Sequence, residues 1–155
     1  MNRSEIEEAL SKCEFFKELE KDDIGKIADL CKVDSFKAGE YVFEQGDFGE
    51  YIYIIAEGQV ALERSVDLGS RKGNVTIGAL GKGRVMGCWS TLLGQPHNLM
   101  SSACCQKPAR IIILEGAHLR KMMLENKTLG FNVMERFCFL LRDRIQAAYG
   151  AMEKF

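Results

Sequence analysis

The chain has 155 residues, 46% of them hydrophobic, and its 21 basic and 22 acidic side chains leave a net charge of −1. We expect residues 1–155 to form one domain, since this length allows a core of its own without metal or disulfide bonds. The balanced charge disfavours DNA as a partner, because nucleic-acid-binding domains usually carry a basic excess. No apolar run is long enough to span a membrane, and the polar N-terminus is unlike a signal peptide. We therefore expect a cytoplasmic protein with no membrane contact.

The N-terminal part of the chain has a helical pattern. Ser4 and Glu7 have the spacing of a capping box, and apolar residues then recur at helical intervals. We expect helices within residues 4–32. The acidic excess of residues 1–23 is interpreted as solvated helix faces rather than a docking site.

Residues 33–114 have a different sequence pattern, in which short apolar runs alternate with glycine-containing turns. This pattern is typical of a β-sandwich or barrel. The continuous apolar run within residues 109–114 predicts a central strand that is covered on both faces. The chain is therefore predicted to be an α+β protein.

Helical periodicity returns in residues 116–152, where a longer helix is expected from about Phe131 onward. Its apolar stripe is too wide for one buried face: either the helix lies deep in the core, or one side packs on the barrel and the other on a second copy, and we favour the second arrangement. A homodimer through this helix is therefore predicted. The residues expected at its interface are Val133, Met134, Phe137, Leu141 and Ile145.

Two neighbouring motifs identify a family. Residues 39–47 read GEYVFEQGD, and residues 51–60 continue as YIYIIAEGQV. This pair resembles the opening of cyclic-nucleotide-binding domains, the family of the catabolite activator protein and of the regulatory subunits of cAMP-dependent protein kinase. The resemblance implies an eight-stranded antiparallel β-roll of jelly-roll type, flanked by N-terminal helices and a long C-terminal helix. Its glycines fit the tight turns of that roll, where a positive φ is accessible mainly to glycine.

The segment that should meet a ligand is residues 81–103, which read GKGRVMGCWSTLLGQPHNLMSSA. A glycine turn, a short strand and a helical turn near Trp89 group several backbone N–H donors, as an anion site requires. The family resemblance implies that this is the phosphate-binding cassette, with Gly83 and Gly87 in place. The family's glutamate, which holds the ribose 2′-hydroxyl, falls on Cys88. Its arginine, which pairs with the cyclic phosphate, falls on His97.

Both replacements weaken the expected chemistry for a cyclic nucleotide. Arginine is a permanently charged, two-pronged donor, whereas histidine is mostly neutral near pH 7. Loss of both contacts is expected to weaken binding by about two to four decades. Lys82 and Arg84 are the nearby cations that could substitute for the arginine. The effector is therefore expected to be another small anion, or cAMP or cGMP bound weakly.

Three functions remain in competition. The first is a small-molecule sensor, whose ligand-binding residues would be Met86, Gly87, Cys88, Trp89, Ser90, Thr91 and His97. The second is a ligand-free protein-interaction module that acts through its helices and dimer surface. The third is a haem or redox sensor that uses Cys88 and His97, which is disfavoured because such a pair arises easily by chance.

Catalysis, DNA binding and metal binding are not expected. The six cysteines show no zinc-like spacing, and the two histidines are too few for a cupin-type metal site. No hydrolase or nucleotide-phosphate-binding motif is present. The chain ends where transcription factors of the resembled family append a helix-turn-helix domain. A regulatory domain of this kind would act through dimerisation or through a separate signalling protein.

Overall fold

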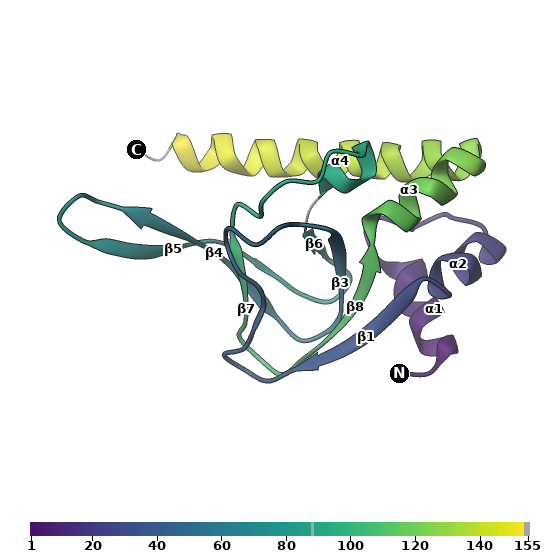
Figure 1. Cartoon of the computed structure of the whole chain (residues 1–155), viewed down its shortest axis with the longest axis horizontal. Coiled ribbons are helices and arrows are strands. Elements are labelled where there is room, and N and C mark those ends of the chain that lie inside the picture. The colour runs from purple at the N-terminus through teal and green to yellow at the C-terminus, as the bar shows by residue number, and fades with distance from the viewer. Residues whose placement is uncertain (88, 154–155) are drawn as a thin grey trace.

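The computed structural model describes residues 1–87 and 89–153. Two four-stranded antiparallel sheets form a roll, with strand orders β1-β8-β3-β6 and β2-β7-β4-β5 (Figure 1). This confirms the expected eight-stranded β-roll. The strands are β1 (Cys31–Phe36), β2 (Tyr41–Phe43), β3 (Tyr51–Glu57), β4 (Val60–Asp67), β5 (Lys72–Leu80), β6 (Val85–Gly87), β7 (Ser102–Cys105) and β8 (Ala109–Glu115).

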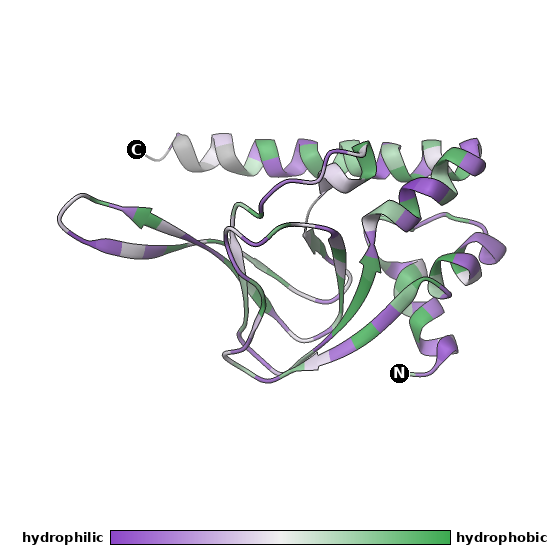
Figure 2. Ribbon diagram, in the orientation of Figure 1, coloured by the Kyte–Doolittle hydropathy of each residue, from purple (hydrophilic) through white to green (hydrophobic). Residues whose placement is uncertain are grey.

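Strand β8 separates two hydrophobic clusters. Ile112 and Leu114 belong to the cluster beneath the helices, whereas Ile111 and Ile113 face the interior of the roll. All four side chains are buried, and β8 is apolar over most of its length in Figure 2. Side chains alternate across a strand, so a strand with both faces covered shows a continuous apolar run. The predicted central strand is confirmed.

Four α-helices and one 3₁₀ helix surround the roll. They are α1 (Arg3–Lys12), α2 (Lys21–Ala28), η1 (Trp89–Leu93), α3 (Gly116–Glu125) and α4 (Lys127–Met152). Helix α1 begins two residues earlier than the expected capping box, because the side chain of Asn2 accepts the Glu5 N–H at 2.9 Å. The capping-box prediction at Ser4 was therefore wrong.

An aromatic cluster joins three distant parts of the chain. Phe15 follows α1, Trp89 opens η1 and Phe137 lies on α4. Their ring centroids are 5.6 Å apart for Phe15–Trp89, 6.0 Å for Phe15–Phe137 and 6.0 Å for Trp89–Phe137. Such edge and tilted contacts are favourable beyond the apolar area that they bury. The cluster thereby fixes η1 against both helical ends of the chain.

Helix α4 has a buried stripe and an exposed stripe. The buried stripe consists of Leu129, Val133, Phe137 and Leu140. Val133 and Phe137 are 0% and 7% exposed, so the chain's own core occupies them and the prediction that they contact a second copy was wrong. The helical periodicity of the sequence identified the apolar positions, but Val133 and Phe137 were assigned to the wrong face of the helix.

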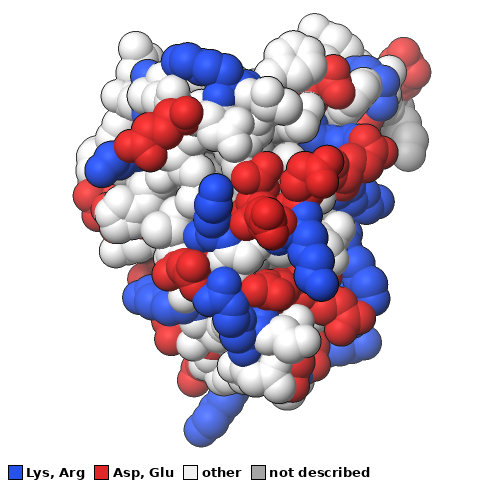
Figure 3. Space-filling model, turned by 90° about the vertical axis from the view of Figure 1, so that its right-hand side faces the viewer, with Lys and Arg blue, Asp and Glu red and all other residues white. Residues whose placement is uncertain are grey.

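Two acidic side chains of α1 are paired with basic residues of the same helix. Arg3 lies 2.9 Å from Glu7, and Lys12 lies 2.6 Å from Glu8. The Lys12 ammonium lowers the pKa of Glu8. Figure 3 shows Lys and Arg interspersed with Asp and Glu over this end of the molecule. This mixture is consistent with solvated helix faces.

Candidate functional site

A cavity of about 290 Å³ lies against the inner wall of the roll. Strands of both sheets, η1, the loop before β7 and helix α4 all contribute to it. Its lining residues are Phe43, Leu62, Arg64, Ile77, Met86, Gly87, Trp89, His97, Leu99, Met100, Ser101 and Arg144. The cavity therefore combines apolar walls with an indole, an imidazole and two guanidinium groups.

The structure separates the sequence-predicted site residues into two groups. Met86, Gly87, Trp89 and His97 line the cavity together. The Ser90 hydroxyl lies 2.6 Å from Nδ1 of His97 and so belongs to the same site. Cys88 lies outside the described residues.

Thr91 faces a different part of the molecule. It is 5% exposed, and a Cβ placed on Gly116 would lie 1.9 Å from its Oγ1. The Thr91 side chain therefore packs against the first residue of α3. It lines a separate groove with Arg120, whose Nη1 donates to the Leu92 carbonyl at 2.6 Å. Thr91 therefore packs between the cassette and α3 and does not line the cavity.

The loop that carries His97 is held by backbone hydrogen bonds. The Gly49 N–H donates to the His97 carbonyl at 3.0 Å, and the Leu99 N–H donates to the Asp47 carbonyl at 2.8 Å. When the Ser90 hydroxyl donates to Nδ1, the imidazole is neutral and carries its proton on Nε2. His97 is then a positioned hydrogen-bond donor, without the fixed charge of an arginine.

Neither cation proposed from the sequence as a substitute lines the cavity. Nε of Arg84 lies 3.0 Å from Oε2 of Glu14 and is paired with that carboxylate. Lys82 lines a separate hollow with Glu5 and Glu8 of α1. The charges at the cavity come instead from Arg64 on β4 and Arg144 on α4.

Neither arginine was predicted from the sequence, because both lie outside the cassette, where the cation was expected. Arg64 follows the buried residues of β4, and its Nη1 donates to the Met100 carbonyl at 3.2 Å. Arg144 lies 43 residues or more from every other lining residue in the sequence. Its position four residues after the buried Leu140 was the available signal, since this spacing continues a helix face.

Arg144 is placed by three contacts. Its guanidinium carbon lies 5.9 Å from the Trp89 ring centroid, and its Nη2 lies 3.4 Å from the Val85 carbonyl and 3.7 Å from Oε1 of Glu14. Burial lowers the pKa of Arg144, and the Glu14 carboxylate partly opposes that shift. The group nevertheless stays charged at neutral pH, because arginine is effectively always protonated in proteins.

Gly87 allows β6 and β3 to approach closely beneath the cavity. Its φ is +116°, and a Cβ placed there would lie 2.5 Å from the Tyr51 carbonyl oxygen. Any other residue would have to shift the β3 backbone. Glycine is therefore required here for both its conformation and its lack of a side chain.

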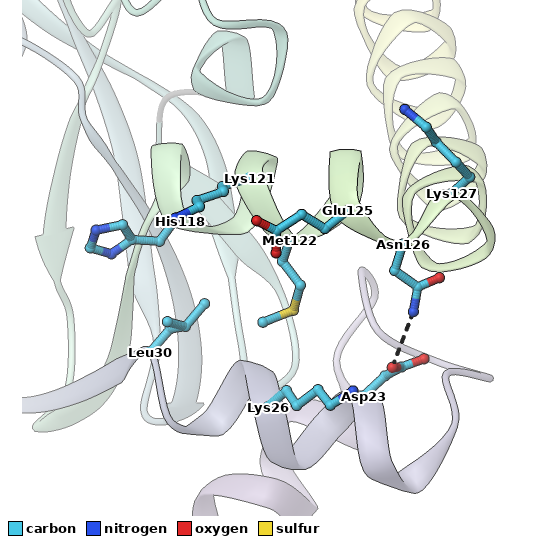
Figure 4. Close-up of a pocket in the computed structure, with 9 residues that line it drawn as sticks. All are labelled: Asp23, Lys26, Leu30, His118, Lys121, Met122, Glu125, Asn126 and Lys127. Atoms are coloured by element: carbon cyan, nitrogen blue, oxygen red, sulfur yellow. Dashed lines mark hydrogen bonds between the residues drawn. The ribbon is translucent and has the colours of Figure 1, made fainter.

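A larger hollow of about 830 Å³ lies elsewhere, between α2 and the junction of α3 with α4 (Figure 4). Asp23 and Glu125 lie among its three lysines, and Asn126 Nδ2 approaches Asp23 Oδ1 at 3.5 Å. The charged side chains are dispersed along its walls in Figure 4 and do not converge on one point. Its chemistry is that of a solvated cleft, so the roll cavity is the better candidate site.

The described residues hold no group of three or more histidine, cysteine or acidic side chains that could bind a metal ion. Burial raises the pKa of Cys13 and of Cys31 to about 12, which keeps both thiols protonated at neutral pH. Within residues 1–87 and 89–153, no helix is long and apolar enough to cross a membrane.

The eight-stranded roll, flanked by helices at both ends of the chain, is the fold of a regulatory domain. Residues 33–126 match the sequence profile of the cyclic nucleotide-binding domain. The chain belongs to the cyclic nucleotide-binding domain family, which confirms the resemblance seen in its sequence.

Individual proteins agree with this assignment. A stretch of 64 residues, 41% of this chain, is 36% identical to the cGMP-dependent protein kinase egl-4 of Caenorhabditis briggsae and spans 8% of that kinase. A cyclic nucleotide-binding domain from Methylobacillus flagellatus superposes with a TM-score of 0.81 at 21% identity, over 99% of this chain and 84% of that one. The regulatory subunit of a cAMP-independent protein kinase A from Trypanosoma brucei superposes with a TM-score of 0.71 at 23% identity, over 87% of this chain and 46% of that one.

The role of Gly87 gives a first prediction. Replacing Gly87 with alanine should lower the free energy of unfolding by about 2 to 4 kcal/mol, because the added Cβ is both strained and in contact with backbone. The same change at Gly69, with a φ of +81° and no atom within 4 Å, should cost only about 1 kcal/mol. Urea denaturation followed by circular dichroism measures both, and equal losses would contradict this account of Gly87.

Proposed function

We propose that this chain is a regulatory sensor domain that binds a small anionic effector in the roll cavity and does not bind cAMP tightly. The observation that carries the proposal is the convergence of Trp89 and His97 with Arg64 and Arg144 on one partly enclosed space. Apolar walls with a few placed polar groups are typical of small-molecule sites. The family assignment supports a ligand-binding role for this cavity.

Weak cyclic-nucleotide binding is proposed from the chemistry of His97. A cyclic phosphate carries a full negative charge, and a guanidinium meets it with two parallel hydrogen bonds. The His97 imidazole, with Ser90 at 2.6 Å from one nitrogen, offers at most one donor to a ligand while it is neutral. The T. brucei neighbour, described as cAMP-independent, supports the view that this fold can serve a regulatory protein without cAMP.

We also propose that α4 joins two copies of the chain, with an interface revised from the sequence-based prediction. Phe131, Met134, Cys138, Leu141 and Ile145 follow one another at intervals of three and four residues. Met134 is half-buried and the other four are exposed, so they form a stripe beside the buried one. This spacing is that of a coiled-coil seam, which favours a second copy of the same helix as the partner.

A screen by thermal shift tests the location of the effector site. Anionic small molecules that bind the cavity should raise the melting temperature by about 5 to 10 °C at 100 times their dissociation constant. Replacing Leu62 with tryptophan, which fills the cavity, should abolish these shifts. Leu68→Trp adds the same side chain on the exposed turn between β4 and β5 and should preserve them. Stabilisation that survives Leu62→Trp would place the site elsewhere.

Calorimetric titration tests the proposal for cyclic nucleotides. Wild-type protein should bind cAMP and cGMP with dissociation constants above about 1 µM. His97→Arg should tighten cAMP binding by at least about tenfold, because it supplies a charged, bidentate donor. His118→Arg, on the exposed surface of α3, is the matched control and should change nothing. Nanomolar binding by the wild-type protein would refute the proposal.

Sedimentation equilibrium tests the proposed dimer. The wild-type protein should be dimeric at tens of micromolar, and Ile145→Glu should make it monomeric, because a charge would enter an apolar seam. Gln146→Glu adds the same charge at the next, exposed residue and should leave the dimer intact. A monomeric wild-type protein at these concentrations would rule the interface out.

A further inference from the structure

We propose that Arg144, assisted by Arg64, holds the anionic group of the effector, and that the effector is an organic anion with an apolar, aromatic body. This inference rests on the proposed sensor function and names the chemistry of the same cavity. The anionic group would then be held by two arginines outside the cassette, on α4 and β4, and not by His97 within it.

Arg144 lies on the core-facing side of its helix. The buried residues Val133, Phe137 and Leu140 are spaced by four and three residues, and Arg144 follows four residues later on the same face. Arg144 thus occupies the next core-facing position of α4, at the cavity wall, and its side chain is only 31% exposed. A charge on the inner face of a helix requires a partner of opposite charge.

The side chains around these arginines carry too little negative charge to balance them. Glu14 is shared between Arg84, at 3.0 Å, and Arg144, at 3.7 Å, and its Oε1 also accepts the Val85 N–H at 2.9 Å. One carboxylate between two guanidinium groups leaves one positive charge uncompensated. Arg64 has no carboxylate within 4.0 Å among the residues that the structure describes. The cavity therefore has a positive rim that an anion would neutralise.

The rest of the cavity, which would contact the body of the ligand, is apolar and aromatic. The walls are formed by apolar side chains, among them Phe43, Leu62 and Leu99, each less than 10% exposed. Trp89 adds an aromatic surface beside the Arg144 guanidinium. No aspartate or glutamate is among the described residues that line the cavity, so a polyhydroxylated or cationic body would find few acceptors there. An aromatic anion matches both the walls and the rim.

Two fluorescent probes with nearly the same body separate the two parts of this inference. Anilinonaphthalene sulfonate carries a sulfonate, whereas phenylnaphthylamine is its neutral counterpart. Wild-type protein should bind the sulfonate more tightly. Arg144→Gln should weaken sulfonate binding about tenfold and Arg64→Gln about threefold, because Arg64 is more exposed and its charge is better screened. Neither change should affect the neutral probe.

Three further variants complete the test. Arg144→Lys keeps the charge and should retain most of the sulfonate affinity; a loss as large as that of Arg144→Gln would show that the charge at this position does not hold the sulfonate. Arg71→Gln removes one exposed charge in the turn between β4 and β5 and is the matched control. Leu62→Trp should exclude both probes.

The possible failures are distinguishable. Equal affinity of the wild-type protein for the two probes, or equal loss of both in Arg144→Gln, would overturn the role of the arginines while leaving the cavity as the binding site. Failure of the wild-type protein to bind either probe, or undiminished binding of both by Leu62→Trp, would overturn the proposed sensor function as well.

Discussion

The contact among Phe15, Trp89 and Phe137 is the interaction on which the arrangement of the site depends. It joins the end of the N-terminal helical region, the cassette helix η1 and the core-facing side of α4. It holds α4 beside the cassette through Phe137, two turns before Arg144 on the same helix. Glu14, the residue before Phe15, strengthens the same junction by pairing with Arg84 and Arg144. Scaffold and site are therefore stabilised by the same neighbouring residues.

Most of the roll could be predicted from the sequence because its signals are local. Glycine turns, short apolar runs and the motif at residues 39–47 all report on nearby backbone, and the continuous run in β8 marked a strand with both faces covered. The helical turn near Trp89 was predicted for the same reason, and it is η1 in the structure. The capping error at Ser4 was also local, since Asn2 offered a competing cap two residues earlier.

The site was less predictable because its residues meet only through the fold. Thr91 shares the cassette with His97, yet it packs against Gly116, because successive residues of a helical turn point in different directions. Arg144 is far from the cassette in sequence and enters the cavity only because α4 returns across the roll. Periodicity likewise showed that the apolar stripe of α4 is too wide for one buried face, but only packing showed that Val133 and Phe137 belong to the inner side.

Trp89 is the chain's single tryptophan, and it lies at once in the aromatic cluster, on the cavity wall and beneath the Arg144 guanidinium. The intrinsic indole emission of the protein consequently originates at one place, between the ligand cavity and the helix that would carry a signal. A bound molecule, a displaced guanidinium or a shift of α4 would each alter the surroundings of that one chromophore. The fold thus contains its own optical reporter, and no label has to be introduced to follow events at the cassette.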